Sequence, residues 1–302
     1  MKAFIRIAVV LCLFAVAYLY VAPVRLTVLA LAGRSGICSV SQSLDIPLHF
    51  KNEMAIKDRI LAASKMIDSD AAFEHWETPY GPFWIPTGSK YVLPFNLAEQ
   101  EMKIYGVGEQ AVKPGDIVLD CGANVGVFVR ESLKAGAKLV VAIEPAPENL
   151  ECLRRNFKSE VEAGKVIIYP KGVWDKDDTL TMRVDPTNSA ADTAVLKTDS
   201  MTKTVQVPLT MVDKLVAELK LEKVDYIKMD IEGAEPNALR GAVETIRKYK
   251  PRLSVSSYHM AEHPVLIPQA INAARTDYKQ SCGPCNEVPG EHRIRPEILY
   301  FR

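Results

Sequence analysis

The sequence lacks an excess of either charge, because 37 Lys and Arg residues balance 37 Asp and Glu residues in a chain of 302 residues. Proteins that bind nucleic acids neutralise phosphates with clustered Lys and Arg, so this balance argues against a nucleic-acid partner. Repeats and low-complexity tracts are missing as well. The hydrophobic content of 48% is enough to build a core, which excludes wholesale disorder.

Closely spaced cysteines are scarce. The six cysteines are spread along the chain, and only Cys282 and Cys285 lie near each other, which is not the spacing of a disulfide framework. The tetrapeptide 282–285 copies a thioredoxin-type redox motif, but that chemistry needs the first thiol at a helix N-terminus inside a βαβ unit. We therefore expect a plain or reducible turn there.

One long hydrophobic run is present near the N-terminus. Residues 7–24 are uncharged and apolar, close to the roughly 20 residues of a membrane-spanning helix. This run predicts a single-pass anchor within residues 1–34. A cleaved signal peptide is one alternative, since Ala30 and Ala32 form an Ala-x-Ala pattern, and a buried helix is another. Basic residues flank the run on both sides, so the positive-inside rule does not decide its orientation.

Residues 35–112 differ from the remainder of the chain. Helical spacing at 54–67 and 97–105 flanks segment 78–88, which is rich in Pro, Gly and aromatic residues and is typical of turns and short extended pieces. We expect a helical region here, in which segment 78–88 could act as a lid.

From residue 113 onward, short apolar segments alternate with helical ones. The best helix is 236–249, which has Pro236 near its start and Pro251 after its end. Alternation of this kind predicts an α/β fold with a mostly parallel, doubly wound sheet. The expected strands are 116–120, 139–143, 166–169, 224–229, 253–258 and 297–301.

The most informative motif, Asp120-Cys-Gly-Ala-Asn-Val-Gly126, follows the first expected strand. Gly122 and Gly126 allow a tight turn at which the backbone can approach a ligand. Glu144 follows the next strand, where a carboxylate can accept hydrogen bonds from both hydroxyls of a ribose. The pattern predicts a nucleoside site. A tight turn without a ligand is the simpler alternative.

The same motif indicates which nucleoside. A dinucleotide site needs Gly-x-Gly-x-x-Gly, but Asp120 occupies the first of these positions and would repel a pyrophosphate. The carboxylate suits the amino group of S-adenosylmethionine, so we predict that cofactor instead of NAD. Trp174 and Asp175 could hold its adenine, although Trp174 could equally belong to the core. The predicted cofactor residues are Asp120, Gly122, Ala123, Asn124, Gly126, Glu144, Pro145, Trp174 and Asp175.

Charged residues also crowd the end of the fourth expected strand. Asp230 and Glu232 would lie at the carboxyl edge of the sheet, where open α/β sheets bind ligands. Glu235 is as readily explained as an acidic residue at a helix start. His259 follows the fifth strand, where either a general base or a structural histidine could lie.

Residues 259–263 match the zinc-protease pattern His-x-x-Glu-His. That pattern needs both histidines on one face of a helix, whereas here it follows a strand and precedes Pro264. We therefore expect no metal site from this motif.

Taken together, these motifs resemble the FkbM methyltransferases. The resemblance covers roughly residues 80–301 and rests on segments 120–126, 141–145, 227–235 and 295–301. It implies a Rossmann-like class I methyltransferase fold over residues 113–302. It also implies methyl transfer from S-adenosylmethionine, commonly to a hydroxyl oxygen of a sugar or natural product, so the expected partner is a small-molecule or glycan acceptor.

The expected reaction is a direct displacement at the sulfonium methyl, with Asp230, Glu232 and His259 as candidates for the base that takes the acceptor's proton. The alternative function is a non-catalytic, membrane-anchored scaffold with a vestigial nucleoside pocket. An NAD-dependent oxidoreductase is disfavoured, because no Tyr-x-x-x-Lys pair lies near the motif. Since S-adenosylmethionine is made in the cytosol, we expect the catalytic domain on the cytosolic side of a membrane.

Overall fold

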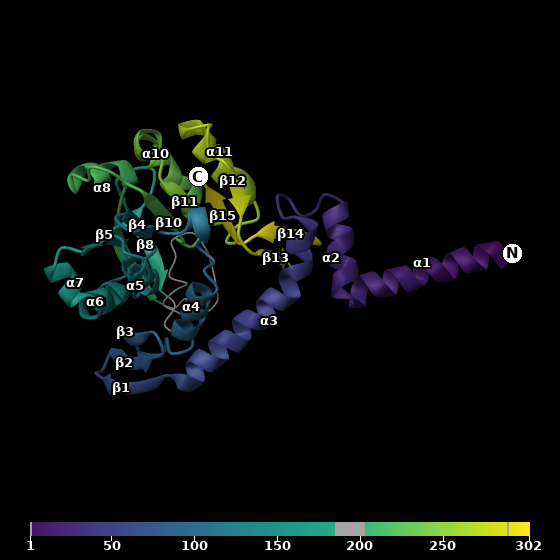
Figure 1. Cartoon of the computed structure of the whole chain (residues 1–302), viewed down its shortest axis with the longest axis horizontal. Helices are drawn as coiled ribbons and strands as arrows, with labels where there is room; N and C mark the ends of the chain where they lie inside the picture. The colour runs from purple at the N-terminus through teal and green to yellow at the C-terminus, as the bar shows by residue number, and fades with distance from the viewer. Residues whose placement is uncertain (1, 185–202, 289) are drawn as a thin grey trace.

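The computed structural model describes residues 2–184, 203–288 and 290–302. Figure 1 shows helices packed around a central sheet, with the first helix, α1 (Lys2–Tyr20), extending away from this domain.

A seven-stranded sheet forms the centre of the domain, in the order β12-β15-β11-β10-β4-β5-β6. Neighbouring strands from β11 to β6 are parallel, whereas β15 runs antiparallel to both β11 and β12. The predicted α/β fold is confirmed, and its sheet is mixed. The strands are β4 (Ile117–Cys121), β5 (Leu139–Ile143), β6 (Val166–Tyr169), β10 (Tyr226–Met229), β11 (Arg252–Ser256), β12 (Gln280–Cys282) and β15 (Ile298–Phe301).

Helices cover both faces of this sheet, because successive strand residues point to opposite sides. Val118 of β4 packs with α5 and α6 in one buried cluster, and the next residue, Leu119, packs with α8 to α11 in another (Figure 1). The helices are α5 (Val127–Lys134), α6 (Pro147–Asn156), α7 (Lys158–Glu162), α8 (Val212–Glu218), α9 (Glu235–Arg240), α10 (Val243–Tyr249) and α11 (His263–Ala274).

The predicted helix 236–249 is interrupted, because α9 ends at Arg240 and α10 begins at Val243. At the break, a Cβ on Gly241 would lie 2.0 Å from the carbonyl oxygen of Trp174. The carboxylate of Asp213 then accepts hydrogen bonds from the first backbone N–H groups of α10. The second helix thus has its own cap, supplied from a distant part of the chain.

Residues 35–112 contain more regular structure than the sequence predicts. The helix expected at 54–67 is confirmed only as far as residue 63, where the longer α3 (Val40–Ala63) ends, because residues 65–67 belong to β1 (Lys65–Ser69). Segment 78–88 contains β3 (Gly81–Pro86) of a small antiparallel sheet with β1 and β2 (Phe73–Thr78). Phe83 and Ile85 are buried in a cluster shared with α4 (Val92–Glu101). Segment 78–88 is therefore packed into the domain. The remaining elements are η1 (Gly108–Gln110), β7 (Gly172–Val173), β8 (Asp178–Val184), β9 (Lys203–Thr210), β13 (Cys285–Val288) and β14 (Arg293–Pro296).

The apolar N-terminal run forms two helices, α1 and α2 (Ala22–Leu31), with Pro23 at the start of the second. In the described part of the chain, no helix alone is long and apolar enough to cross a membrane; α1 from Phe4 and α2 qualify only as a pair, bent by 100°. The predicted single transmembrane helix is thus not supported. Because a proline lacks the N–H that a continuing helix needs, α2 starts anew and buries Leu26 and Leu29.

A disulfide joins Cys38, just before α3, to Cys285 at the start of β13. The sequence did not indicate this bond, because the two cysteines are 247 positions apart. The Sγ atom of Cys282 lies 4.0 Å from that of Cys285. Segment 282–285 therefore connects β12 to β13 and presents one thiol beside a disulfide.

Candidate active site

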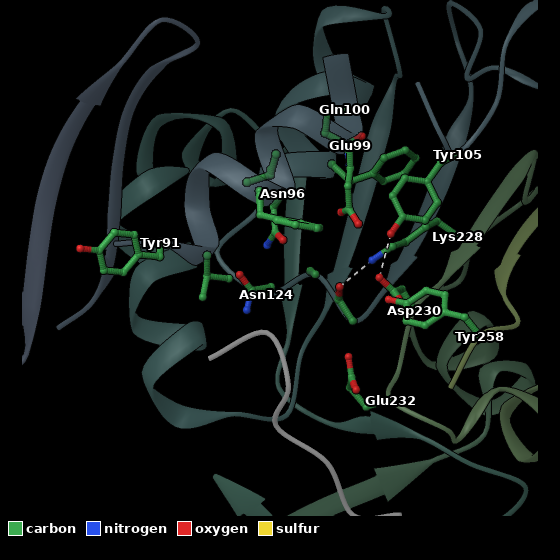
Figure 2. A pocket seen from close by; sticks show the side chains of 16 residues that line it. Tyr91, Asn96, Glu99, Gln100, Tyr105, Asn124, Lys228, Asp230, Glu232 and Tyr258 are labelled. Carbon is green, nitrogen blue, oxygen red and sulfur yellow. Dashed lines mark hydrogen bonds between the residues drawn. The ribbon is translucent and has the colours of Figure 1, made fainter. Parts of the chain in front are cut away.

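A cavity of about 550 Å³ lies at the carboxyl ends of β4 and β10 (Figure 2). The turn after β4 forms one side and the acidic end of β10 another, while α4 closes a third. The described lining residues are Tyr91, Val92, Phe95, Asn96, Glu99, Gln100, Tyr105, Gly122, Ala123, Asn124, Val127, Phe128, Lys228, Asp230, Glu232 and Tyr258. Five predicted site residues are among them: Gly122, Ala123, Asn124, Asp230 and Glu232.

Glycine is required where the two turns meet. Gly122 has a φ of +81°, and a Cβ there would lie 2.0 Å from the carbonyl oxygen of Asp230. Gly126 has a φ of +94°, and its Cβ would lie 2.1 Å from the Phe157 ring. Only glycine allows these two close approaches without strain. Gly122 thus lets the ends of β4 and β10 come together, and Gly126 lets the turn after β4 pack against Phe157.

A buried ion pair lies beneath the cavity. The Nζ atom of Lys228 is 3.2 Å from Asp120 Oδ1 and donates a hydrogen bond to the carbonyl of Gly122 at 2.7 Å. Burial lowers the pKa of Lys228, but Asp120 and Asp230 outweigh it and raise the pKa, so the ammonium stays charged. Asp120 is 0% exposed and is not among the described lining residues. Asp120 thus holds Lys228, which reaches the cavity, and the direct contact of Asp120 with the cofactor stays a prediction.

Asp230 projects into the cavity as a carboxylate. Its Oδ2 accepts a hydrogen bond from Tyr105 at 2.7 Å, and its Oδ1 accepts one from Tyr258 at 3.4 Å (Figure 2). Burial raises its pKa, but Lys228 and His259 outweigh this effect, and the pKa lies below 3.8. Asp230 is thus a fixed negative charge that faces the cavity.

Glu232 has different properties from Asp230. Its backbone is left-handed, with a φ of 53°, a conformation that non-glycine residues adopt at an energetic cost. Burial raises the pKa of Glu232 above 4.5, although His259 opposes this effect. A carboxylate of this kind accepts a proton more readily than Asp230 does.

His259 lies behind these two carboxylates, and its side chain is 3% exposed. Its Nε2 is 3.6 Å from Asp230 Oδ1 and 3.4 Å from Glu232 Oε1, and its Nδ1 is 2.9 Å from Glu235 Oε1. Burial lowers the pKa of His259, but Glu235 and Glu232 raise it well above 6.5. The neutral form that a general base requires is therefore disfavoured.

Glu235 starts α9, as an acidic helix-start residue would, but it also has a second role. Its carboxylate is fully buried and accepts hydrogen bonds from the N–H groups of Ile231 and Gly233. It therefore stabilises the turn that carries Glu232 and lies against His259.

Glu144 and Pro145 lie at the end of β5 and are not among the described lining residues. Glu144 is buried and accepts hydrogen bonds from the N–H groups of Asn124 and Ala146, each at 2.8 Å. Its carboxylate thus stabilises the turn after β4, which bears Asn124 in a left-handed conformation.

Trp174 and Asp175 also lie outside the described lining. Trp174 packs against the small buried cluster of Ala146, Val207 and Leu209. The carboxylate of Asp175 is 3.6 Å from the guanidinium of Arg240. Trp174 and Asp175 therefore contact other parts of the protein in this structure and do not line the described cavity.

The sequence analysis missed the wall formed by α4 and the residues beyond it. Glu99 points into the cavity from α4 (Figure 2). Burial and the charge of Asp230 raise its pKa well above 4.5. Tyr105 and Tyr258 were missed as well, although Tyr258 precedes His259 in the sequence. The helical spacing at 97–105 was the one available signal for this wall.

A second cavity, of about 300 Å³, adjoins the first and shares Phe95, Glu99 and Tyr258 with it. It lies between α3 and the β13–β14 hairpin, and Glu53 and Glu297 line it. Burial, aided by the charge of Glu53, raises the pKa of Glu297 to about 7.

Residues 120–275 match the methyltransferase FkbM domain, which is more than half of the chain. Methyltransferase 1 of Beauveria bassiana is 28% identical over 143 residues, which are 41% of this chain and 57% of that protein. The 2-O-methyltransferase NoeI of Sinorhizobium fredii is 27% identical over 154 residues, which are 45% of this chain and 61% of that protein.

The chain thus spans about three fifths of the length of these curated relatives. The solved FkbM methyltransferase of Methylobacillus flagellatus KT is 19% identical, with a TM-score of 0.47 over 85% of this chain and 60% of that one. The domain match includes the turn after β4, the acidic end of β10 and His259. The chain therefore belongs to the family of methyltransferases that contain the FkbM domain.

Proposed function

We propose that the protein transfers a methyl group from S-adenosylmethionine to a hydroxyl oxygen of a sugar, glycan or other small acceptor. The observation that carries this proposal is the cavity between the Gly122 turn and the acidic end of β10 (Figure 2). Family membership supports methyl transfer, and the name of the relative NoeI supports oxygen as the acceptor atom.

Two opposite charges in the cavity suit the amino-acid part of S-adenosylmethionine. Lys228 offers an ammonium to its carboxylate, and Asp230 offers a carboxylate to its amino group. The glycine at position 122 lets the backbone come close to such a ligand. When bound, this molecule supplies a methyl group on a positively charged sulfur, which is a good leaving group.

The side chains then have two tasks. Asp230 stays negative near the reacting atoms, while Glu232, with its raised pKa, takes the proton of the acceptor hydroxyl as the oxygen–methyl bond forms and the sulfur–methyl bond breaks. We rank Glu232 above Asp230 as the base for this reason. His259 ranks last because its raised pKa keeps it protonated.

Calorimetry of the full chain with S-adenosylmethionine tests the cofactor assignment. We expect one saturable site, and Asp230→Asn should weaken it at least tenfold, which corresponds to about 1.4 kcal/mol for one charged contact. Glu131→Gln is the control, because Glu131 pairs with Lys134 on the outer side of α5. An absence of binding by the folded wild-type protein would refute the proposal and favour the scaffold function, which no observation supports at present.

A second assay identifies the atom that is methylated. The protein is incubated with methyl-labelled S-adenosylmethionine and a panel of glycans and hydroxylated small molecules. A methyl ether survives mild alkali, whereas a methyl ester is hydrolysed. Label that is released by alkali, or that is recovered on nitrogen, would contradict O-methylation of a hydroxyl.

We also propose that α1 contacts a lipid membrane and that the catalytic domain lies on the cytosolic side, where S-adenosylmethionine is made. The apolar side chains of α1 are exposed, Leu13 by 65%. Disulfides persist mainly in oxidising compartments, so this location requires Cys38 and Cys285 to be thiols in the cell.

Protease and a thiol-alkylating reagent, added to cells before and after the membrane is opened, test this location. We expect cleavage of the domain and labelling of Cys38 only after opening. Cleavage before opening, or a Cys38 that resists alkylation until a reductant is added, would place the domain on the opposite side.

A further inference from the structure

We propose that Asp230, Glu232 and His259 bind a divalent metal cation at the wall of the cavity. The Nε2 atom of His259 is 3.6 Å from Asp230 Oδ1 and 3.4 Å from Glu232 Oε1, and one ligand atom from each residue lies within 4.8 Å of the others. The zinc-protease pattern at 259–263 did not indicate this set of ligands. Only His259 belongs to that pattern, whereas Asp230 and Glu232 follow the end of β10.

The buried imidazole of His259 is surrounded by carboxylates. Its two ring nitrogens form ion pairs with three of them at 3.6 Å or less, and none of these contacts has regular hydrogen-bond geometry. Buried polar atoms are almost always hydrogen-bonded, so a group of carboxylates around one buried imidazole needs an explanation. A cation between Nε2 and the carboxylates of Asp230 and Glu232 would be coordinated by all three groups once it displaces the proton of the imidazolium, because only the neutral ring binds a metal.

The other nitrogen of the ring has the partner that a metal-binding histidine usually has. Glu235 Oε1 lies 2.9 Å from Nδ1, and hydrogen bonds from Ile231 and Gly233 fix the Glu235 carboxylate. In metal sites a carboxylate at the far nitrogen commonly orients the imidazole toward the ion. Glu235 is thus a positioning residue, which holds both the ring of His259 and the turn that carries Glu232.

The spacing and the donor types favour a cation of the Mn²⁺ and Mg²⁺ class. Ligand atoms about 2.1 Å from one ion lie roughly 3.0–3.4 Å apart, so the two separations from His259 Nε2 need only a few tenths of an ångström of contraction. Two carboxylates and one imidazole suit Mn²⁺, which accepts both kinds of donor. Three protein ligands leave positions in an octahedron for water and for an acceptor oxygen.

The catalytic use of this ion rests on the proposed methyl transfer, whereas its binding does not. Asp230 and Glu232 line the cavity, so an ion bound to them would face an acceptor hydroxyl. Such an ion lowers the pKa of the hydroxyl. A carboxylate that holds the ion through one oxygen can accept the hydroxyl proton on the other, so Glu232 could serve in both roles.

A neighbouring arrangement makes a sharp comparison possible. His263 also contacts Glu235, with Nδ1 at 3.5 Å from Glu235 Oε2, and these two residues form an alternative set with His259. Loss of His263 would remove a ligand of the alternative set and none of the proposed one. His263→Gln is therefore the matched control for His259→Gln.

Titration of the purified full chain with Mn²⁺, followed by electron paramagnetic resonance, tests the proposal without a methyl acceptor. We expect one Mn²⁺ per chain, displaceable by Mg²⁺. Binding should weaken at least tenfold in Glu232→Gln and in His259→Gln and change less than twofold in His263→Gln. Thermal unfolding verifies that each variant is folded, and Glu232→Gln carries the test if His259→Gln does not fold.

Two outcomes overturn the inference: no Mn²⁺ binding by the wild-type chain, or binding that Glu232→Gln leaves unchanged. Calorimetry with S-adenosylmethionine in the presence of a chelator separates this result from the proposed function. Cofactor binding without Mn²⁺ binding removes the metal site alone. Mn²⁺ binding without cofactor binding leaves the metal site and removes the methyltransferase proposal.

Discussion

Among single residues, Lys228 connects the charges of the site. The residue is 5% exposed, and its ammonium interacts with the buried Asp120 and the cavity-lining Asp230. A buried charge that loses its partner is costly, because the interior solvates it poorly. Lys228 therefore keeps the two carboxylates close to each other at neutral pH.

Removal of this ammonium should destabilise the fold. We expect Lys228→Met to lower the free energy of unfolding by about 3–5 kcal/mol, because Asp120 stays buried without a counter-charge. Asp120→Asn combined with Lys228→Met should cost less than the sum of the single changes, which urea denaturation measures. Strictly additive costs would show that the two side chains are not coupled.

Glu297 should make the stability depend on pH. Its carboxyl titrates at about pH 7 in the folded chain because of burial and Glu53, against a usual pKa of 4.5. The folded state thus binds more protons at Glu297 between these values, so the contribution of Glu297 to stability is full below pH 4.5 and is lost as the pH rises to about 7. The other titratable or charged groups among the described residues that line this cavity are His49, Glu99, Tyr258, Glu287 and Arg295.

The substitution Glu297→Gln should remove this pH dependence. At pH 8 we expect the variant to be more stable than the wild type by on the order of 3 kcal/mol, because no buried charge forms, and at pH 4.5 the two should be similar. Chemical denaturation at both pH values measures the difference. Equal stabilities at pH 8 would contradict the assigned pKa.

At the scale of elements, the contact between the ends of β4 and β10 builds the site. Substitutions of Gly122 and Gly115 test the importance of this contact. Both residues have similar φ values, +81° and +85°, but a Cβ would meet the carbonyl oxygen of Asp230 only at Gly122. We expect Gly122→Ala to lower the unfolding free energy by about 2–4 kcal/mol and Gly115→Ala by about 1 kcal/mol. Thermal and urea unfolding of both variants would show this difference, and equal losses would mean that the close approach is unimportant.

The disulfide connects two other elements, the start of α3 and β13. In the oxidised protein, Cys38→Ser should lower the unfolding free energy by about 2–4 kcal/mol, because a cross-link over a long loop restricts the unfolded chain. Cys12→Ser is the control, since Cys12 is exposed on α1 and unpaired. If a reductant fails to bring the wild type down to the stability of Cys38→Ser, the bond is not the cause.

At the scale of the whole molecule, α1 differs from the rest of the chain. It extends from the domain with apolar side chains exposed (Figure 1). We expect the full chain to sediment with anionic lipid vesicles and Leu13→Asp to reduce the bound fraction several-fold, because a charge in the apolar surface opposes insertion. The unfolding transition should stay unchanged. Sedimentation that is equal for both proteins would remove lipid as the partner of α1.

The sequence by itself determined six of the seven strands of the central sheet, the turn after β4 and the acidic end of β10, whereas it did not indicate β12 or the three small sheets. The features that it determined are local, because apolar periodicity, glycine spacing and charge next to a strand can be read without knowledge of distant contacts. Gly122, Asp230 and Glu232 could therefore be assigned to one site from their places at strand ends.

Only the tertiary structure decided which polar groups face the cavity and which ones form hydrogen bonds or ion pairs within the protein. In the folded chain Asp120 pairs with Lys228, and Glu144 accepts hydrogen bonds from backbone N–H groups. The helix α4 packs over the site. A disulfide also joins Cys38 to Cys285. These outcomes depend on contacts between segments far apart in the chain, whose hydrogen bonds and charges are matched only when the fold closes.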